Sequence, residues 1–195
     1  GDMVWVAGLA DNGPIDGYSG ATALGIAALE GMNGINSNFT WGQTFFGQIP
    51  GSIGETSTFL ILLAGAYMVY TKIASWRIIF GTLTGMIVMS SALNLIGSDT
   101  NPMFAIPWYW HLTIGSFAFG LVYMATEPVS AANTNMGRWI YGISIGVIVV
   151  LIRVRNPAFP EGMMLAILFA NLLAPAIDFT ITSLNTSRRM ERYNS

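Results

Sequence analysis

The chain has 195 residues, of which 53% are hydrophobic and only 9% are charged, and its net charge is -2. A soluble domain usually has about 25% charged residues. Here the apolar residues also come in long runs, so we expect a membrane protein rather than a soluble all-helical one. The lack of a basic excess argues against nucleic-acid binding, and with no cysteine and one histidine (His111) the chain excludes disulfides, thiolate metal sites and bis-histidine haem within itself.

The first segment with chemical interest is 16–22, which reads Asp-Gly-Tyr-Ser-Gly-Ala-Thr. It is a glycine-bearing turn that enters a predicted helix, and a helix N-terminus presents free N–H groups and a positive dipole end to a phosphate. A phosphoryl group held there as an ester on Thr22 is one interpretation. The other is ordinary N-capping by Ser19 or Asp16 with Thr22 incidental, and the spacing alone favours this second interpretation.

The predicted helix at 20–33 is too short and too alanine-rich to cross a bilayer, so we expect a re-entrant or surface-lying helix. Its flanks are rich in Gly, Asn and Pro and predict loops. Because the chain opens Gly-Asp-Met-Val-Trp without a signal-peptide pattern, we expect it to be the later part of a longer protein. Segment 1–54 is thus predicted to be a loop-rich, outer-side region.

Segment 55–195 is predicted to be a bundle of five spanning helices, which makes the fold class all-α and polytopic. The apolar runs lie at 55–71, 76–97, 103–126, 139–154 and 161–179. Glycines recur four residues apart in two of these runs, at Gly81/Gly85 and Gly142/Gly146, a spacing that lets helices pack closely in lipid.

Three acids lie at the ends of these runs. Ser52 and Glu55 have the spacing of a capping box, so Glu55 either satisfies the start of the first span or lines an ion path. Glu127 follows the third span, and Asp178 lies three residues after the helix-bending Pro175 in the fifth. Carboxylates within a membrane are costly and usually functional, so Glu55, Glu127 and Asp178 are candidates to line an ion path. For Asp178, a shallow position in contact with water is the alternative.

The basic residues predict the orientation. With five alternating spans, six of them share one side and only Arg153 and Arg155 face the other; the six are Lys72, Arg77, Arg138, Arg188, Arg189 and Arg192. Because cytoplasmic loops carry the excess of Lys and Arg, the larger group and the C-terminus are predicted to be cytoplasmic, and Thr22 lies outside.

Residues 16–22 resemble the flavinylation motif, in which a threonine bonds FMN through a phosphodiester. The resemblance extends over essentially the whole chain, at 51–57, 74–77, 97–101, 107–111 and 160–162. These strings are similar to the B subunit of the Na+-translocating NADH:quinone oxidoreductases. The D subunit of the Rnf-type ferredoxin:NAD oxidoreductases shares the motif, but the Trp-Tyr-Trp-His string at 108–111 fits the former better. Glu127 departs conservatively from the aspartate that is common in this family.

The resemblance implies a urea-transporter-like fold in a bacterial inner membrane. It also implies covalent FMN on Thr22, a riboflavin held in the complete protein, and electron passage to ubiquinone coupled to Na+ movement. The ion path that Glu55, Glu127 and Asp178 are candidates to line would then be a Na+ path. Other subunits of the complex and membrane lipid are the implied partners. Around the FMN we expect Asp16, Ser19, Gly20 and Ala21.

Arg153 and Arg155 are predicted either to neutralise the flavin or its phosphate, or to pair with Glu161. A passive solute channel of the urea-transporter kind is the rival function, for which the motif at 16–22 would be useless.

Overall fold

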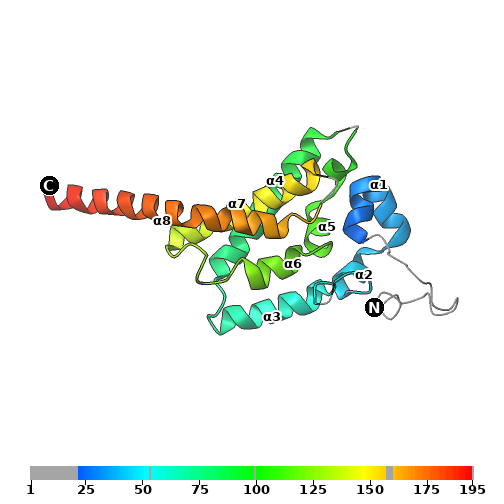
Figure 1. Ribbon diagram of the computed structural model, residues 1–195, viewed down its shortest axis with the longest axis horizontal. Coiled ribbons are helices and arrows are strands. Elements are labelled where there is room, and N and C mark those ends of the chain that lie inside the picture. The colour runs from blue at the N-terminus through cyan, green and yellow to red at the C-terminus, as the bar shows by residue number, and fades with distance from the viewer. Residues whose placement is uncertain (1–21, 53, 99, 157–159, 195) are drawn as a thin grey trace.

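The computed structural model describes residues 22–52, 54–98, 100–156 and 160–194. The described part is helical throughout, with no strand, so the predicted fold class is confirmed (Figure 1). Its elements are α1 (Ala23–Asn38), α2 (Trp41–Phe46), α3 (Thr58–Tyr70), α4 (Trp76–Ile96), η2 (Pro102–Ala105), α5 (Trp108–Thr113), α6 (Phe117–Phe119), η3 (Gly120–Met124), α7 (Asn135–Arg155) and α8 (Met163–Asn194).

Three helices of the described chain are long and apolar enough to cross a membrane, namely α4, α7 and Met163–Arg192 of α8. They match the second, fourth and fifth predicted spans. The first predicted span corresponds to α3, which has 13 residues and falls short of the ~20 that a straight crossing requires. The fifth span was predicted to end at 179, but α8 continues to Asn194. Its whole length is 32 residues, or about 48 Å, and its C-terminal part projects beyond the bundle (Figure 1).

The third predicted span is not one continuous helix, and that prediction was wrong. Residues 103–126 contain η2, α5, a break, the single turn α6 and the π-helical turn η3. At the break Ile114 is extended (φ -99°, ψ 137°) and Gly115 has a positive φ of 70°, a conformation that glycine adopts without strain. Ile114 and Phe117 are fully buried, so this non-helical backbone is covered by protein, as the interior of a membrane requires.

The two glycine pairs lie where α4 and α7 cross, so the predicted close packing at these glycines is confirmed. A Cβ atom on Gly146 would fall onto the backbone carbonyl oxygen of Thr82, and one on Gly85 would fall onto that of Ile143. The two helix backbones therefore touch directly at these positions.

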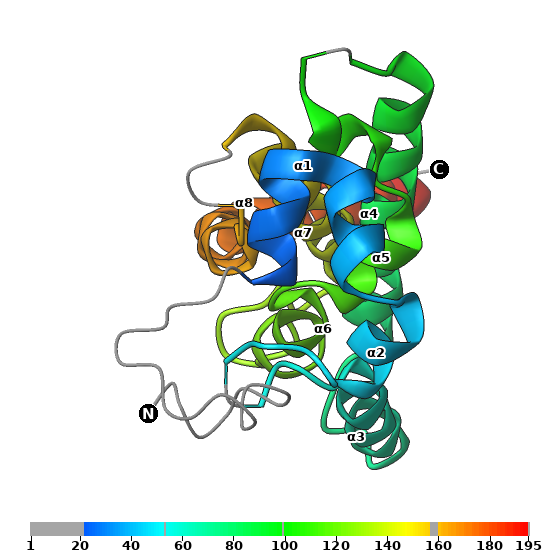
Figure 2. The same cartoon turned by 90° about the vertical axis from the view of Figure 1, so that its right-hand side faces the viewer.

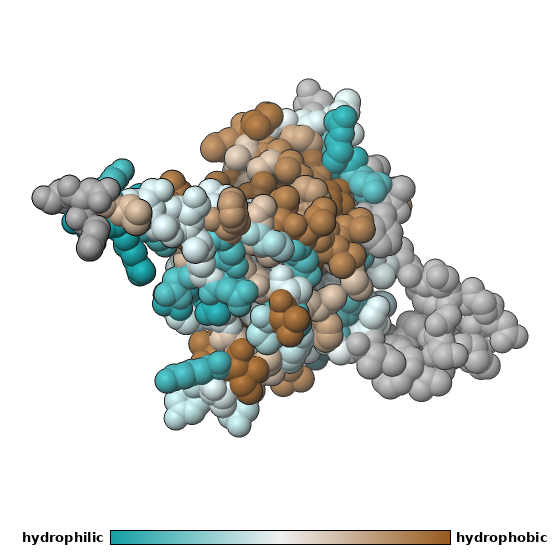
Figure 3. Space-filling view, turned by 60° about the vertical axis from the view of Figure 1, so that its left-hand side comes forward, coloured by the Kyte–Doolittle hydropathy of each residue, from teal (hydrophilic) through white to brown (hydrophobic). Residues whose placement is uncertain are grey.

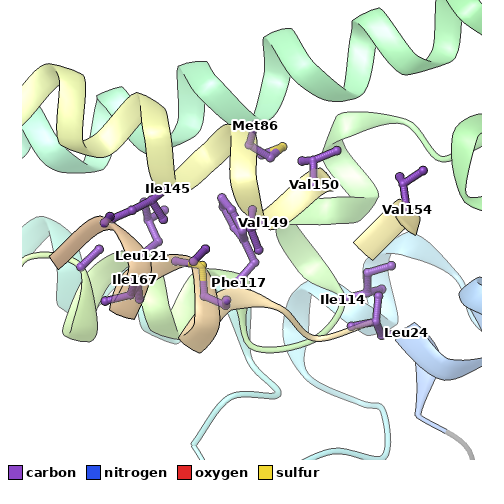
Figure 4. Close-up of a cluster of buried hydrophobic side chains, with 14 of the residues drawn as sticks. Leu24, Met86, Ile114, Phe117, Leu121, Ile145, Val149, Val150, Val154 and Ile167 are labelled. Atoms are coloured by element: carbon purple, nitrogen blue, oxygen red, sulfur yellow. The ribbon is translucent and has the colours of Figure 1, made fainter. Parts of the chain in front are cut away.

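The buried core lies between α4, α7, α8 and the broken α5–η3 segment. In Figure 4, Met86, Ile145, Val149 and Phe117 converge there from α4, α7 and α6. Outside this core the helices present a broad apolar surface (Figure 3), as a lipid-facing bundle would.

Helix α1 covers one end of the bundle together with α2 (Figure 2). It occupies 23–38 rather than the predicted 20–33, and it kinks at Gly31, where φ is 64° and a Cβ would strike Pro102. Leu24 at its start packs into the same core as Ile114 and Val154 (Figure 4). This packing brings Thr22 to the end of the bundle where α7 ends and α8 begins.

Candidate functional site

Thr22 is the N-cap of α1. Its backbone is extended (φ -69°, ψ 156°), and its side-chain oxygen accepts a hydrogen bond from Gly25 N–H at 3.1 Å. The cap is thus Thr22 itself, and the interpretation that placed Ser19 or Asp16 at the cap of this helix was wrong. The remaining predicted motif residues, Asp16, Ser19, Gly20 and Ala21, lie outside the described residues.

Within the described part of the chain, the first turn of α1 retains hydrogen-bond donors without a partner beside this hydroxyl. Gly25 N–H is bonded to the Thr22 side chain and Ile26 N–H to the Thr22 carbonyl oxygen. The N–H groups of Ala23 and Leu24 come earlier in the turn and have no acceptor within the helix. An anion bonded to the exposed Thr22 oxygen would therefore lie at the positive end of α1.

A shallow hollow adjoins Thr22, and we refer to it as the Thr22 hollow. Its walls come from α1, from the 49–56 loop, from the break after α5 and from the start of the α8 segment. Glu55, Thr56, Thr113, Gly115 and Glu161 are among its lining residues. The sequence did not single out Glu161 or the break at Gly115 as parts of this site, because four separate segments converge here.

Glu55 and Glu161 hold the loops of the Thr22 hollow in place. Glu55 accepts a hydrogen bond from Ser52 N–H at 3.2 Å, which is half of the predicted capping box. The box does not start the helix, however, because α3 begins later, at Thr58, with Ser57 as its cap. Glu161 accepts from both the backbone N–H (3.0 Å) and the hydroxyl (2.7 Å) of Ser116, and so fixes the chain just after the break.

Arg153 lies on the last turn of α7 with its side chain fully buried. Its guanidinium donates to the carbonyl oxygens of His111 (2.7 Å) and Ile114 (3.0 Å) and lies over the ring of Phe117. These carbonyls belong to the C-terminal end of α5, where a helix dipole is negative. Arg153 therefore compensates the broken helix end.

The predicted pair between Arg153 and Glu161 is not a direct salt bridge in the described chain. The two charges attract one another electrostatically, but Glu161 takes its hydrogen bonds from Ser116. Arg155 is exposed at the end of α7.

Asp178 lies at the opposite end of α7 and joins two helices. Its carboxylate accepts hydrogen bonds from Asn133 N–H (2.6 Å), Thr134 N–H (3.0 Å) and the Thr134 hydroxyl (2.6 Å). Thr134 is the N-cap of α7, so Asp178 on α8 ties the start of α7 to α8.

Glu127 closes a turn just after η3. It accepts hydrogen bonds from the hydroxyl and the N–H of Ser130 and from Val129 N–H, and these bonds lower the pKa of its carboxyl below the usual value. The carboxylate therefore stays charged at neutral pH. Its contribution to the turn is complete above the ordinary glutamate pKa and is lost as the pH falls through the lowered one.

Comparison with known proteins connects this geometry to a family. The sequence profile of the NQR2, RnfD, RnfE family matches residues 2–186. The chain belongs to this family. Curated members that are named as the B subunit of Na(+)-translocating NADH-quinone reductase align with nearly all of it. The Azotobacter vinelandii protein is 59% identical over 193 residues, which are 98% of this chain and 46% of that protein.

Other members of the family agree. The Neisseria meningitidis serogroup A protein is 56% identical over 199 residues, covering 100% of this chain and 47% of its own length. A Pseudomonas aeruginosa protein (strain UCBPP-PA14) is 54% identical over 193 residues, which are 98% of this chain and 46% of that protein. The chain thus spans about half the length of the curated family members it matches.

Proposed function

We propose that this chain is the FMN-carrying part of a membrane subunit of a Na+-translocating NADH:quinone reductase, with FMN held as a phosphodiester on Thr22. The observation that carries the proposal is the position of the Thr22 hydroxyl, which is exposed at the N-terminus of α1 and borders a hollow. The names of the relatives supply the reaction class.

The residues around Thr22 fit a bound phosphate. The side-chain oxygen is accessible for an ester bond, and it keeps its lone pairs for Gly25 N–H after esterification. The free donors of the first turn stabilise the phosphate charge. FMN would supply the capacity to accept and donate electrons, and the protein supplies its placement and electrostatics.

The buried charges near the hollow have a supporting role in this proposal. Arg153 is committed to the carbonyls of α5, so its contribution to the flavin is a long-range positive field rather than a direct contact. Glu161 holds the break at Gly115 beside the hollow. Arg155, which is exposed at the same end of α7, is the cation left to approach the phosphate.

The orientation remains part of the proposal. Lys72, Arg77 and Arg138 line one cavity at the start of α4 and α7, whereas Arg153 and Arg155 end α7 beside the Thr22 hollow. This separation supports a cytoplasmic side at the first cluster and an outer, periplasmic side at Thr22, in a bacterial inner membrane. Electrons would pass from FMN toward ubiquinone, with riboflavin and further subunits supplied by the complete complex.

Thr22→Asn is expected to abolish covalent flavin and leave the fold intact. Asparagine is at least as good an N-cap as threonine but has no hydroxyl to esterify. In-gel flavin fluorescence of the denatured protein and mass spectrometry of the tryptic peptide measure the adduct. Thr56→Ala, which removes a different hydroxyl from the same hollow, should retain full flavin content. An adduct that persists on the Thr22→Asn protein would refute the assignment.

We further propose that Glu127 and Asp178 lower the barrier to Na+ entry at the end of the bundle opposite Thr22, with Glu55 a third candidate on the Thr22 side. An ion that leaves water needs replacement oxygens. Asp178→Asn is expected to raise the Na+ concentration for half-maximal quinone reduction about fivefold. That factor corresponds to the ~1 kcal/mol with which one charge attracts another at 4 Å in water. The measurement is a sodium titration of activity normalised to bound FMN.

The hydrogen bonds of Asp178 make a matched control necessary. Thr134→Val removes the hydroxyl that donates to Asp178 and caps Gly137, but it leaves the carboxylate charge in place. It should lower stability without moving the Na+ half-saturation point. Equal shifts in Thr134→Val and Asp178→Asn would show that the loop, not the carboxylate, sets the Na+ dependence.

A further inference from the structure

A cavity of about 560 Å³ lies at the end of the bundle opposite the Thr22 hollow. Its walls come from the end of α3, the start of α4, the 126–132 segment and the first turn of α7. Its size is within the range of small-ligand sites. We call it the basic cavity because its charged lining residues in the described chain are Lys72, Arg77 and Arg138.

No acidic side chain among the described lining residues neutralises the cations of the basic cavity. The nearby Asp178 attracts Arg138, but the Asp178 carboxylate accepts its hydrogen bonds from Asn133 and Thr134. The Glu127 carboxylate accepts hydrogen bonds from Val129 and Ser130. The Lys72 ammonium makes no hydrogen bond or ion pair in the described part of the chain, and Arg77 rests on the ring of Trp76. The cavity therefore has a positive potential without an internal counter-ion.

Two further features of the cavity favour an oxyanion. The N-terminus of the 21-residue helix α4 opens into it, and its cap, Ser75, makes no side-chain capping bond. The Ser75 hydroxyl has no hydrogen-bond partner in the described part of the chain, and its oxygen is shielded from solvent in the present side-chain conformation. An anion at the helix N-terminus would accept hydrogen bonds from the first N–H groups of α4, and from the Ser75 hydroxyl once its side chain turns toward the cavity.

The position of the cavity identifies the kind of anion. It lies where the apolar α3 ends and the candidate span α4 begins, which is a membrane–water boundary. The exposed Tyr70, Ile73 and Trp76 flank it, and Trp76 packs edge-on against Trp139 of α7. Aromatic side chains of this kind accompany the headgroup level of a bilayer.

We infer that the basic cavity binds the phosphate headgroup of an anionic phospholipid, such as phosphatidylglycerol. Lys72, Arg77 and Arg138 supply the charge, while Ser75 and the first turn of α4 supply the hydrogen bonds. The exposed apolar side chains beside the cavity, Ile73 and Phe80, are available to the acyl chains. Basic pockets between transmembrane helices are suited to lipid headgroups of this type.

The test titrates phosphatidylglycerol or phosphatidylcholine into the detergent-purified complete protein and counts bound lipid by native mass spectrometry. The wild type is expected to hold one phosphatidylglycerol in preference to phosphatidylcholine. Each cation near a headgroup is worth about a fivefold change in affinity, so Lys72→Gln with Arg77→Gln should weaken phosphatidylglycerol binding about 25-fold. Arg188→Gln with Arg189→Gln removes the same charge from the exposed end of α8 and should leave it unchanged.

Lys72 offers a second test that separates binding from folding. Its φ of 62° is in the left-handed region, which costs a lysine conformational energy that glycine avoids. Lys72→Gly should therefore keep or raise the melting temperature and still weaken phosphatidylglycerol binding about fivefold.

Three results would overturn the inference. The first is unchanged phosphatidylglycerol binding in the cavity variants, and the second is an equal loss in the α8 control. The third is selective binding of inorganic phosphate at the cavity with no preference between the two lipids, which would make it a site for a free anion.

Discussion

Arg153→Met is expected to destabilise the fold by about 3–6 kcal/mol, because it removes two buried hydrogen bonds from a charged donor, each worth about 1.5–3 kcal/mol. Methionine fills a similar volume but donates no hydrogen bond, so the carbonyl oxygens of His111 and Ile114 would lose their partner inside the protein. His111 and Ile114 are enclosed by protein, so no solvent reaches these carbonyls to replace the guanidinium. The negative end of α5 would also lose its compensating charge.

The melting temperature and the yield of folded protein in detergent measure this effect. Arg155→Met is the matched control, because it removes the same charge two residues later, at an exposed position. Its expected effect is within about 0.5 kcal/mol, as for other surface substitutions. If both variants melt alike, the buried hydrogen bonds of Arg153 do not support the break.

Long apolar runs were sufficient to predict α4, α7 and the membrane part of α8, because a helix that is surrounded by lipid needs little more than length and apolar side chains. The same criterion failed at 103–126. That segment is as apolar as its neighbours, but Pro107 and Gly115 divide it, and the hydrogen bonds of Arg153 and Glu161 hold the chain around the break. A hydropathy pattern carries no information about such tertiary partners.

The acids show a similar limit. Glu127 and Asp178 stand out in the sequence because a carboxylate near lipid is rare. The sequence does not reveal that Asp178 holds the cap of α7, since Asn133 and Thr134 are more than forty residues away along the chain. The motif at 16–22 was easier to recognise, because its residues are contiguous in the sequence, and α1 begins directly after it.

Gly146→Ala is expected to destabilise the protein by about 3 kcal/mol, the upper part of the range for overpacking. The added methyl group would meet three backbone atoms of α4, from Thr82, Gly85 and Met86. Backbone atoms cannot rotate away as a side chain does, so α4 and α7 would have to move apart.

Gly42→Ala is the matched control for this substitution. Gly42 also lies in a helix, but its added methyl group would meet nothing within 4 Å. The gain in helix propensity, about 1 kcal/mol, is similar for the two substitutions, so Gly42→Ala should be neutral or stabilising. The difference between their melting temperatures measures the cost of separating the two helices.

Because the start of α7 lines the basic cavity and its end holds the break beside Thr22, a shift of α7 should also reduce flavin attachment in Gly146→Ala. Wild-type stability and flavin content in Gly146→Ala would mean that α4 and α7 do not touch at this crossing.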